Sequence, residues 1–221
     1  TQPGNGIYAA APDVATSFMV RAAPVNVYFA SVTNPTTTAK VGEMAAVLTP
    51  NTNQCSVLIV APEAGINTAV TFTINANGDF TASISSLSAS PAGAPVSGEP
   101  QRAAAPVPYS LRGRLINGRI QGVIDPLGIL FDAPVLSADG PSASSAGFYE
   151  SSALGAGTGK TYAVVGSGNQ VLTLASTPEA TVGGVAQLKA DRTIEFGAQV
   201  NSAPVVVSLK VDPVSTTIEG G

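Results

Sequence analysis

Apolar and polar residues alternate along most of the chain. In the segment "AVTFTIN", Val70, Phe72 and Ile74 fall on one face of an extended strand, while Thr71 and Thr73 fall on the other. The segments "QVLTLAS" and "VVVSLKV" follow the same two-residue period. Successive side chains of a β-strand point to opposite faces of the sheet, so this period predicts strands. No convincing window has the helical spacing i, i+3, i+4 and i+7. We therefore expect an all-β fold, an antiparallel β-sandwich or barrel.

The segment "YSLRGRLINGRIQGVI" predicts the clearest local structure, a β-hairpin. Asn117-Gly118 favours a type I′ turn, because both central positions of that turn need a positive φ. A turn of this length sets the register, with three facing pairs on one side of the hairpin: Leu115 and Ile120, Gly113 and Gly122, Leu111 and Ile124. We expect this side to face the core and a large neighbouring side chain to cover the glycine pair.

The chain also contains an internal duplication. Residues 44–84 and residues 161–200 both run through a short strand, a polar turn ending in Asn-Gln, an apolar strand, a Pro-Glu-Ala turn and two more strands. Asn53-Gln54 matches Asn169-Gln170, and residues 62–64 match residues 178–180. Each unit opens with an aromatic strand, "VYFASV" at Val27 and "GFYESSA" at Gly147. The pattern predicts a β-meander that occurs twice.

The duplication divides the chain into three parts. Residues 1–25 are an N-terminal extension outside the repeat, residues 26–137 form the first β unit, and residues 147–221 form the second. A Pro- and Ala-rich stretch at 88–108 interrupts the first unit, and we expect it to be a surface loop. The separator "SADGPSASSAG" also has the composition of a loop. Whether the units form one barrel or sandwich, or two packed sheets, stays open.

Four segments of the chain share a layout with a known class of protein: "GFYESSA", "TYAVVGSGNQVLTL", "NANGDFTASI" and "GRLINGRIQGVI". Together they resemble the duplicated β-strand modules of large exported bacterial surface proteins. The likeness covers residues 26–221 and rests on turns and alternation. It implies export to the cell surface and no known catalysis.

Composition excludes several classes of function. Charged residues make up 11% of the chain, where an ordinary soluble protein has about 25%. The net charge of −4 opposes nucleic-acid binding, which needs clustered Lys and Arg. The chain has no His, which removes Ser-His-Asp and Cys-His catalysis and the usual zinc sites. No apolar run approaches the roughly 20 residues of a membrane span. We expect an exported protein without cofactor, metal, nucleic-acid partner or membrane span, which acts outside the cell or at its surface.

The segment "LGAGTGKT" is similar to a nucleotide-binding phosphate loop but fails two requirements. That loop needs Gly, four residues and then Gly-Lys-Ser/Thr, and the first position here is Leu154. The Lys must also open a helix whose N–H groups face the phosphates. Lys160 instead leads into "TYAVVG", a predicted strand. We interpret the segment as a hairpin loop that binds no nucleotide.

Two further candidates have simple interpretations. The segment "NANGD" at 75–79 hints at a calcium loop, but only Asp79 is charged, so a β-turn is favoured. The equivalent segment of the second unit, "KADRT", lacks the pattern.

Cys55 aligns with Val171, which predicts a small buried hydrophobic residue and not a nucleophile.

Three arginines carry the remaining candidate for a binding site. Arg112, Arg114 and Arg119 project from the outer face of the predicted hairpin. They could contact an anionic sugar or a sulfate, although charges that simply face solvent are the commoner explanation.

Three functions from different classes remain. The one we favour is a non-enzymatic extracellular subunit of a filament or surface array, in which strand edges and termini join copies of the chain into an oligomer or polymer. The alternative is a glycan-binding or adhesin module. The third is a hydrolase with an acid pair, for which the chain offers no motif and no Trp as a sugar platform.

Overall fold

The computed structural model describes residues 25–85, 108–151, 159–176, 181–200, 203–212 and 217–220. Regular structure in these residues is antiparallel β-strand apart from two short 3-10 turns, η1 (Pro62–Ala64) and η2 (Ala143–Ser145), so the all-β prediction is confirmed. The strands are β1 (Asn26–Thr33), β2 (Lys40–Thr49), β3 (Gln54–Ala61), β4 (Ile66–Thr73), β5 (Asp79–Ile84), β6 (Tyr109–Ile116), β7 (Arg119–Asp125), β8 (Ile129–Pro134), β9 (Gly147–Ser151), β10 (Lys160–Val165), β11 (Gln170–Ser176), β12 (Thr181–Gln187), β13 (Thr193–Val200), β14 (Ala203–Asp212) and β15 (Thr217–Gly220). Except for Val25 and Pro108, the predicted N-terminal extension and the loop at 88–108 lie outside the described residues.

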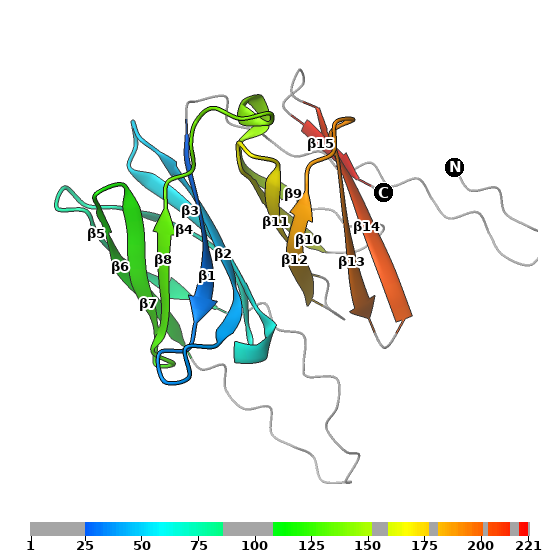
Figure 1. Ribbon diagram of the computed structural model, residues 1–221. Helices are drawn as coiled ribbons and strands as arrows, with labels where there is room; N and C mark the ends of the chain where they lie inside the picture. The colour runs from blue at the N-terminus through cyan, green and yellow to red at the C-terminus, as the bar shows by residue number, and fades with distance from the viewer. Residues whose placement is uncertain are drawn as a thin grey trace, which may run out of the picture.

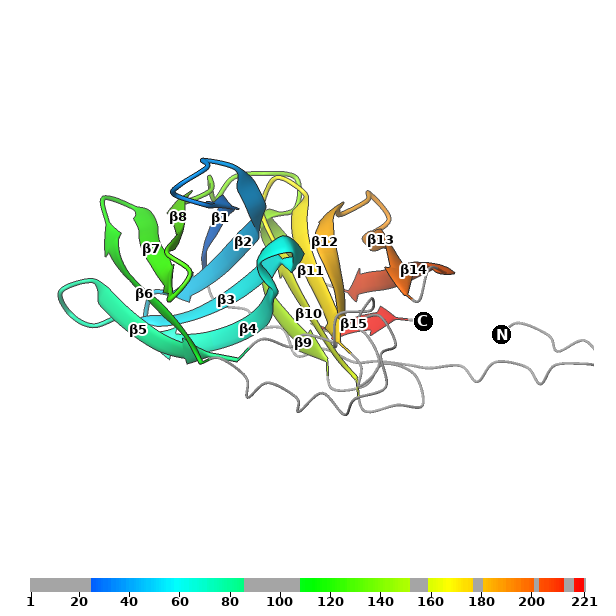
Figure 2. The same cartoon turned by 90° about the horizontal axis from the view of Figure 1, so that it is seen from below.

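Strands β1 to β8 form one sheet that curls into a nearly closed barrel (Figures 1 and 2). Its order is β4-β3-β2-β1-β8-β7-β6-β5, so two four-stranded meanders join where β1 pairs with β8. Near the opposite ends of the sheet, the hydroxyl of Thr68 donates a hydrogen bond to the carbonyl of Ser85 at 2.9 Å. The inside of this curve is filled by buried apolar side chains, among them Tyr28, Met44 and Leu111.

The second unit repeats the strand order of the first. Strands β9 to β12 pair in sequence as β1 to β4 do, and β13-β14-β15 follow the order of β5-β6-β7. The registers agree as well: Tyr28 lies opposite Ala46, and Tyr149 lies opposite Ala163. Both tyrosines are buried inside their own unit. The predicted duplication therefore extends from the sequence motifs to the pairing of individual residues.

The Asn-Gln motif marks equivalent turns. Asn53 and Asn169 both adopt a positive φ, 50° and 70°. The carbonyl of Asn53 accepts a hydrogen bond from the N–H of Ile74 at 2.9 Å, and that of Asn169 accepts one from Leu188 at 2.8 Å. The other shared motif forms η1 in the first unit, while residues 178–180 lie outside the described residues.

The two units pack face to face through β1–β4 and β9–β12. Val47 and Leu58 on the outside of the first meander contact a cluster that includes Val164 and Leu174 of the second. The other faces of these strands line the separate interiors of the two units. Residues 44–48 of β2 are all buried, which explains why the run "MAAVL" breaks the alternation. The arrangement is two packed β units.

The predicted hairpin is confirmed in detail. Asn117 and Gly118 have φ of 51° and 70°, and the three facing pairs are those expected from a two-residue turn. The glycine pair is covered by two rings: Phe80 lies over Gly113 and Phe131 over Gly122.

We expect Gly122→Ala to lower the free energy of unfolding by about 1–3 kcal/mol, as overpacked sites do. A Cβ at this position would collide with the ring of Phe131 and with the carbonyl oxygen of Arg112. Gly184→Ala in β12 is the matched control, because nothing lies within 4 Å of its Cβ position. We expect that control to change stability by less than about 1 kcal/mol. Urea denaturation measures both, and equal losses would contradict the packing of Phe131 on Gly122.

Candidate functional site

The three arginines predicted as an anion contact lie on the outer face of β6 and β7, and each already pairs with an aspartate. The side chains on both sides of these pairs are exposed or partly exposed. The donors and acceptors are Arg114 Nε and Asp79 Oδ1 at 2.5 Å, Arg119 Nε and Asp132 Oδ1 at 2.7 Å, and Arg112 Nε and Asp125 Oδ2.

These pairs form part of a polar row across four strands. Asp79, Arg114, Gln121 and Asp132 lie opposite one another on β5, β6, β7 and β8. The hydrogen bond from Arg114 lowers the pKa of Asp79, and the hydrogen bond from Arg119 lowers that of Asp132. An incoming anion would meet guanidinium groups whose charge a neighbouring carboxylate already neutralises. Anion binding by Arg112, Arg114 and Arg119 stays a prediction, and the pairing opposes it.

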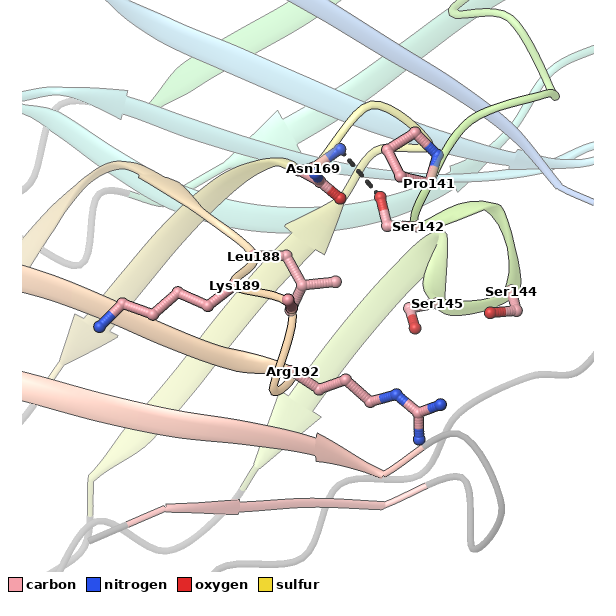
Figure 3. Close-up of a pocket in the computed structure, with 9 residues that line it drawn as sticks. Pro141, Ser142, Ser144, Ser145, Asn169, Leu188, Lys189 and Arg192 are labelled. Atoms are coloured by element: carbon pink, nitrogen blue, oxygen red, sulfur yellow. Dashed lines mark hydrogen bonds between the residues drawn. The ribbon is translucent and has the colours of Figure 1, made fainter.

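A second candidate site lies where the segment between the units meets the turns of the second unit (Figure 3). It is an open pocket of about 360 Å³. The walls come from residues around η2, from the turn between β10 and β11, and from the turn between β12 and β13. The lining residues are Pro141, Ser142, Ser144, Ser145, Asn169, Leu188, Lys189, Ala190 and Arg192.

The wall around η2 is fixed by hydrogen bonds to the neighbouring turn. The buried Ser142 Oγ donates to the carbonyl of Gly166 at 2.6 Å and accepts from the N–H of Asn169 at 2.9 Å. The hydroxyl of Tyr149 donates to the carbonyl of Ser145. Burial raises the pKa of Tyr149, so this hydroxyl keeps its proton. The sequence predicted only a loop here, because four serines in one low-complexity stretch give no sign of which one anchors it.

The opposite wall carries an arginine in an unusual backbone conformation. Arg192 has a φ of 66°, and the equivalent turn of the first unit places Gly78 there with a φ of 85°. The equivalence follows from matching hydrogen bonds, Gly78 N–H to Asn75 and Arg192 N–H to Lys189. A residue with a side chain is less stable than glycine in this conformation by roughly 1 kcal/mol.

The other charged groups of this turn are engaged. Lys189 Nζ donates to Glu195 at 2.5 Å. The carboxylate of Asp191 accepts from Thr193, at 3.1 Å from the N–H and 2.7 Å from the hydroxyl. Arg192, in contrast, makes no ion pair with any residue in the described part of the chain. The composition and motifs of the chain did not single out Arg192, although the loss of the "NANGD" pattern in "KADRT" was a signal.

The motifs interpreted as turns and loops have those roles where they are described. Lys160 opens β10, as predicted, and its Nζ lies 3.6 Å from Glu150; residues 152–158 lie outside the described part. In "NANGD", Asn75 Oδ1 accepts from the N–H groups of Asn77 and Asp79, both at 2.9 Å. The described ranges contain no group of three His, Cys, Asp or Glu side chains close enough to bind a metal ion. They also contain no helix with the length and apolarity needed to span a membrane.

Cys55 is a core residue. It lies opposite Leu48, as Val171 lies opposite Val165, which confirms the alignment of Cys55 with Val171. Both are fully buried. Burial raises the pKa of the Cys55 thiol to about 12, which removes the thiolate that a nucleophile needs.

Comparison with known proteins gives no match, whether to a protein-family model, to a curated protein or to a solved structure. The resemblance to modules of exported bacterial proteins therefore stays a prediction. So do the extracellular location and the non-enzymatic function.

We expect Cys55 to be unreactive toward a disulfide reagent such as dithionitrobenzoate at pH 8 in the folded protein, because the thiol is buried and its pKa is raised. Unfolding in urea should expose one thiol per chain, since Cys55 is the only cysteine. Absorbance of the released thiolate measures the reaction. Rapid labelling in native buffer would show that β3 opens at low cost.

We expect the Asp79 carboxyl to titrate below its ordinary pKa of about 3.9. Because pairing with Arg114 favours the charged form in the folded state, its contribution to stability is present above the unfolded pKa and is lost as pH falls through the lowered folded pKa. Carbon-13 NMR of the aspartates measures this. Arg114→Gln should return the Asp79 midpoint to the ordinary range. Arg119→Gln is the control and should move the Asp132 midpoint while leaving that of Asp79 in place.

Proposed function

We propose that this chain is a non-enzymatic structural subunit outside the cell, which joins neighbouring copies into a filament or array through strand edges and its N-terminal segment. The observation that carries the proposal is the open edge of β9. The matching strand of the first unit, β1, pairs with β2 on one side and with β8 on the other. Among the described strands, β9 pairs with β10 alone.

The first unit indicates which groups β9 offers at this edge. The carbonyl of Val27 accepts a hydrogen bond from the N–H of Leu136 at 2.8 Å, so the polar groups of Val27 face the β8 side. In the first unit Val27 lies opposite Val47, and in the second unit Phe148 lies opposite Val164. Phe148 is therefore the counterpart of Val27. Backbone groups alternate in direction along a strand, so Phe148 and Glu150 present N–H and C=O groups at the open edge. Such an edge is a template for a further strand.

The N-terminal segment has the sequence pattern of a donor strand. In residues 16–22, Thr16, Phe18, Val20 and Ala22 alternate with Ser17, Met19 and Arg21. Strand β8 carries a similar alternation, with Ile129, Phe131 and Ala133 buried and the residues between them exposed. Lys and Glu at strand edges usually prevent such pairing, and β9 carries a single charged residue, Glu150.

The second candidate function, a glycan-binding module, is favoured by a different observation, the pocket beside η2. That pocket contains hydroxyl groups and the guanidinium of Arg192, which has no ion pair among the described residues. The two functions use separate surfaces and are tested separately.

We expect the full chain to associate with rising concentration in sedimentation velocity, and Glu150→Pro to weaken that association at least tenfold. Proline has no N–H to donate, and it is tolerated where a strand's N–H faces away from its own sheet. Glu150→Gln is the matched control: it loses the charge and the contact with Lys160 but keeps the N–H. We expect it to associate like the unchanged chain.

Deletion of residues 1–22 tests the donor. A truncated chain that keeps its circular dichroism and melting temperature but no longer associates supports the proposal. A full-length chain that stays monomeric at high concentration contradicts it, and so does association that persists after the deletion. A deletion that lowers the melting temperature of a monomer would show that the segment completes its own sheet.

A further inference from the structure

Arg192 adopts a backbone conformation that residues with a side chain disfavour. Its left-handed φ is the conformation for which the first unit uses Gly78. The carboxylate of Asp191 in the same turn accepts from Thr193 and makes no ion pair with Arg192. Arg192 is exposed, so solvent stabilises its charge, and its conformation is the observation that indicates a role other than the stability of the turn.

The positive charge faces an open pocket. Figure 3 shows Lys189 extending away from the pocket while the guanidinium of Arg192 extends on the side of Ser144 and Ser145. Lys189 is neutralised by Glu195, so within the described residues the pocket has one cation without a partner. An arginine in this state is a donor fork that fits the two oxygens of a carboxylate or of a sulfate.

The rest of the pocket suits a sugar ring. Ser144 and Ser145 bring hydroxyl groups that both donate and accept hydrogen bonds. Pro141 and Leu188 provide apolar contact. A volume of about 360 Å³ is at the small end of the range for ligand pockets, the size of one or two sugar rings.

The pocket is preorganised. The two hydrogen bonds of Ser142 hold the η2 wall against Gly166 and Asn169, at 2.6 and 2.9 Å. The N–H of Leu188 donates to the carbonyl of Asn169 at 2.8 Å and so ties the opposite wall to the same turn. The backbone of both walls is therefore already in place before a ligand binds, which favours binding.

We propose that this pocket binds an acidic monosaccharide unit, with its carboxylate or sulfate on Arg192 and its ring hydroxyls on Ser144 and Ser145. The site differs from the arginines of β6 and β7, whose guanidinium groups are all paired. It is independent of the strand edge of β9.

The test is a titration of the full chain by nitrogen-15 NMR at low salt, with sodium glucuronate and glucose 6-sulfate as probes and with glucose and sodium sulfate as matched controls. We expect the two acidic sugars to bind with a Kd of about 1 mM, which is usual for ligands of this size. The affected amides should be those of residues 142–145 and 188–192. Glucose and sodium sulfate should each bind at least tenfold more weakly.

Arg192→Gly separates binding from stability. We expect it to weaken glucuronate binding at least tenfold while the melting temperature stays the same or rises, because glycine prefers the conformation that Arg192 adopts. Arg114→Gln is the control for general loss of positive charge and should bind glucuronate like the unchanged chain.

Four binding results would overturn the proposal. They are no binding of glucuronate at 50-fold above the expected Kd, unchanged binding by Arg192→Gly, equal affinity for glucose and glucuronate, and equal affinity for inorganic sulfate and the acidic sugars. The last would identify the pocket as a site for free anions. A lower melting temperature of Arg192→Gly would show that the side chain stabilises the turn and would equally overturn the assigned role.

Discussion

The contact between the two meanders determines where everything else in this molecule lies. It buries Val47, Leu58, Val164 and Leu174 on strands whose opposite faces already line a core. Each such side chain contributes about 1.5–3 kcal/mol when fully buried. Strands covered on both faces leave little surface for polar chemistry, so the three arginine–aspartate pairs and the pocket lie elsewhere. The pairs are on the outer face of β5–β8, and the pocket is around η2 and the neighbouring turns.

The pocket follows from how the chain passes from one unit to the next. The segment after β8 crosses the end of the second unit, where the turn after β10 offers a carbonyl and an N–H. The hydroxyl of Ser142 forms a hydrogen bond with each of them, and η2 therefore lies beside the turn between β12 and β13. A loop that would otherwise only connect two units thereby becomes a fixed wall, and the turn opposite it carries the arginine.

Features set by turn chemistry or by the internal repeat were predictable from the sequence, and features that depend on pairing between strands far apart in the chain were not. The register of the Asn117-Gly118 hairpin and the equivalence of Cys55 with Val171 follow from turn chemistry and repeat alignment. The pairing of Arg114 with Asp79 joins residues 35 positions apart and depends on β5 lying beside β6. Arg192 could not be predicted for another reason. Its positive φ, and the equivalence of its turn position with that of Gly78, are known only from the structure.

The surface that joins the two units contains equivalent residues from both sides. Leu58 lies opposite Ala45 as Leu174 lies opposite Tyr162, and all four belong to the interface cluster. A patch that meets its own counterpart is also the arrangement of a two-fold homodimer. The chain therefore has the form of such a dimer with its two halves covalently linked. In such a molecule equivalent turns need not carry the same residue, as Gly78 and Arg192 show.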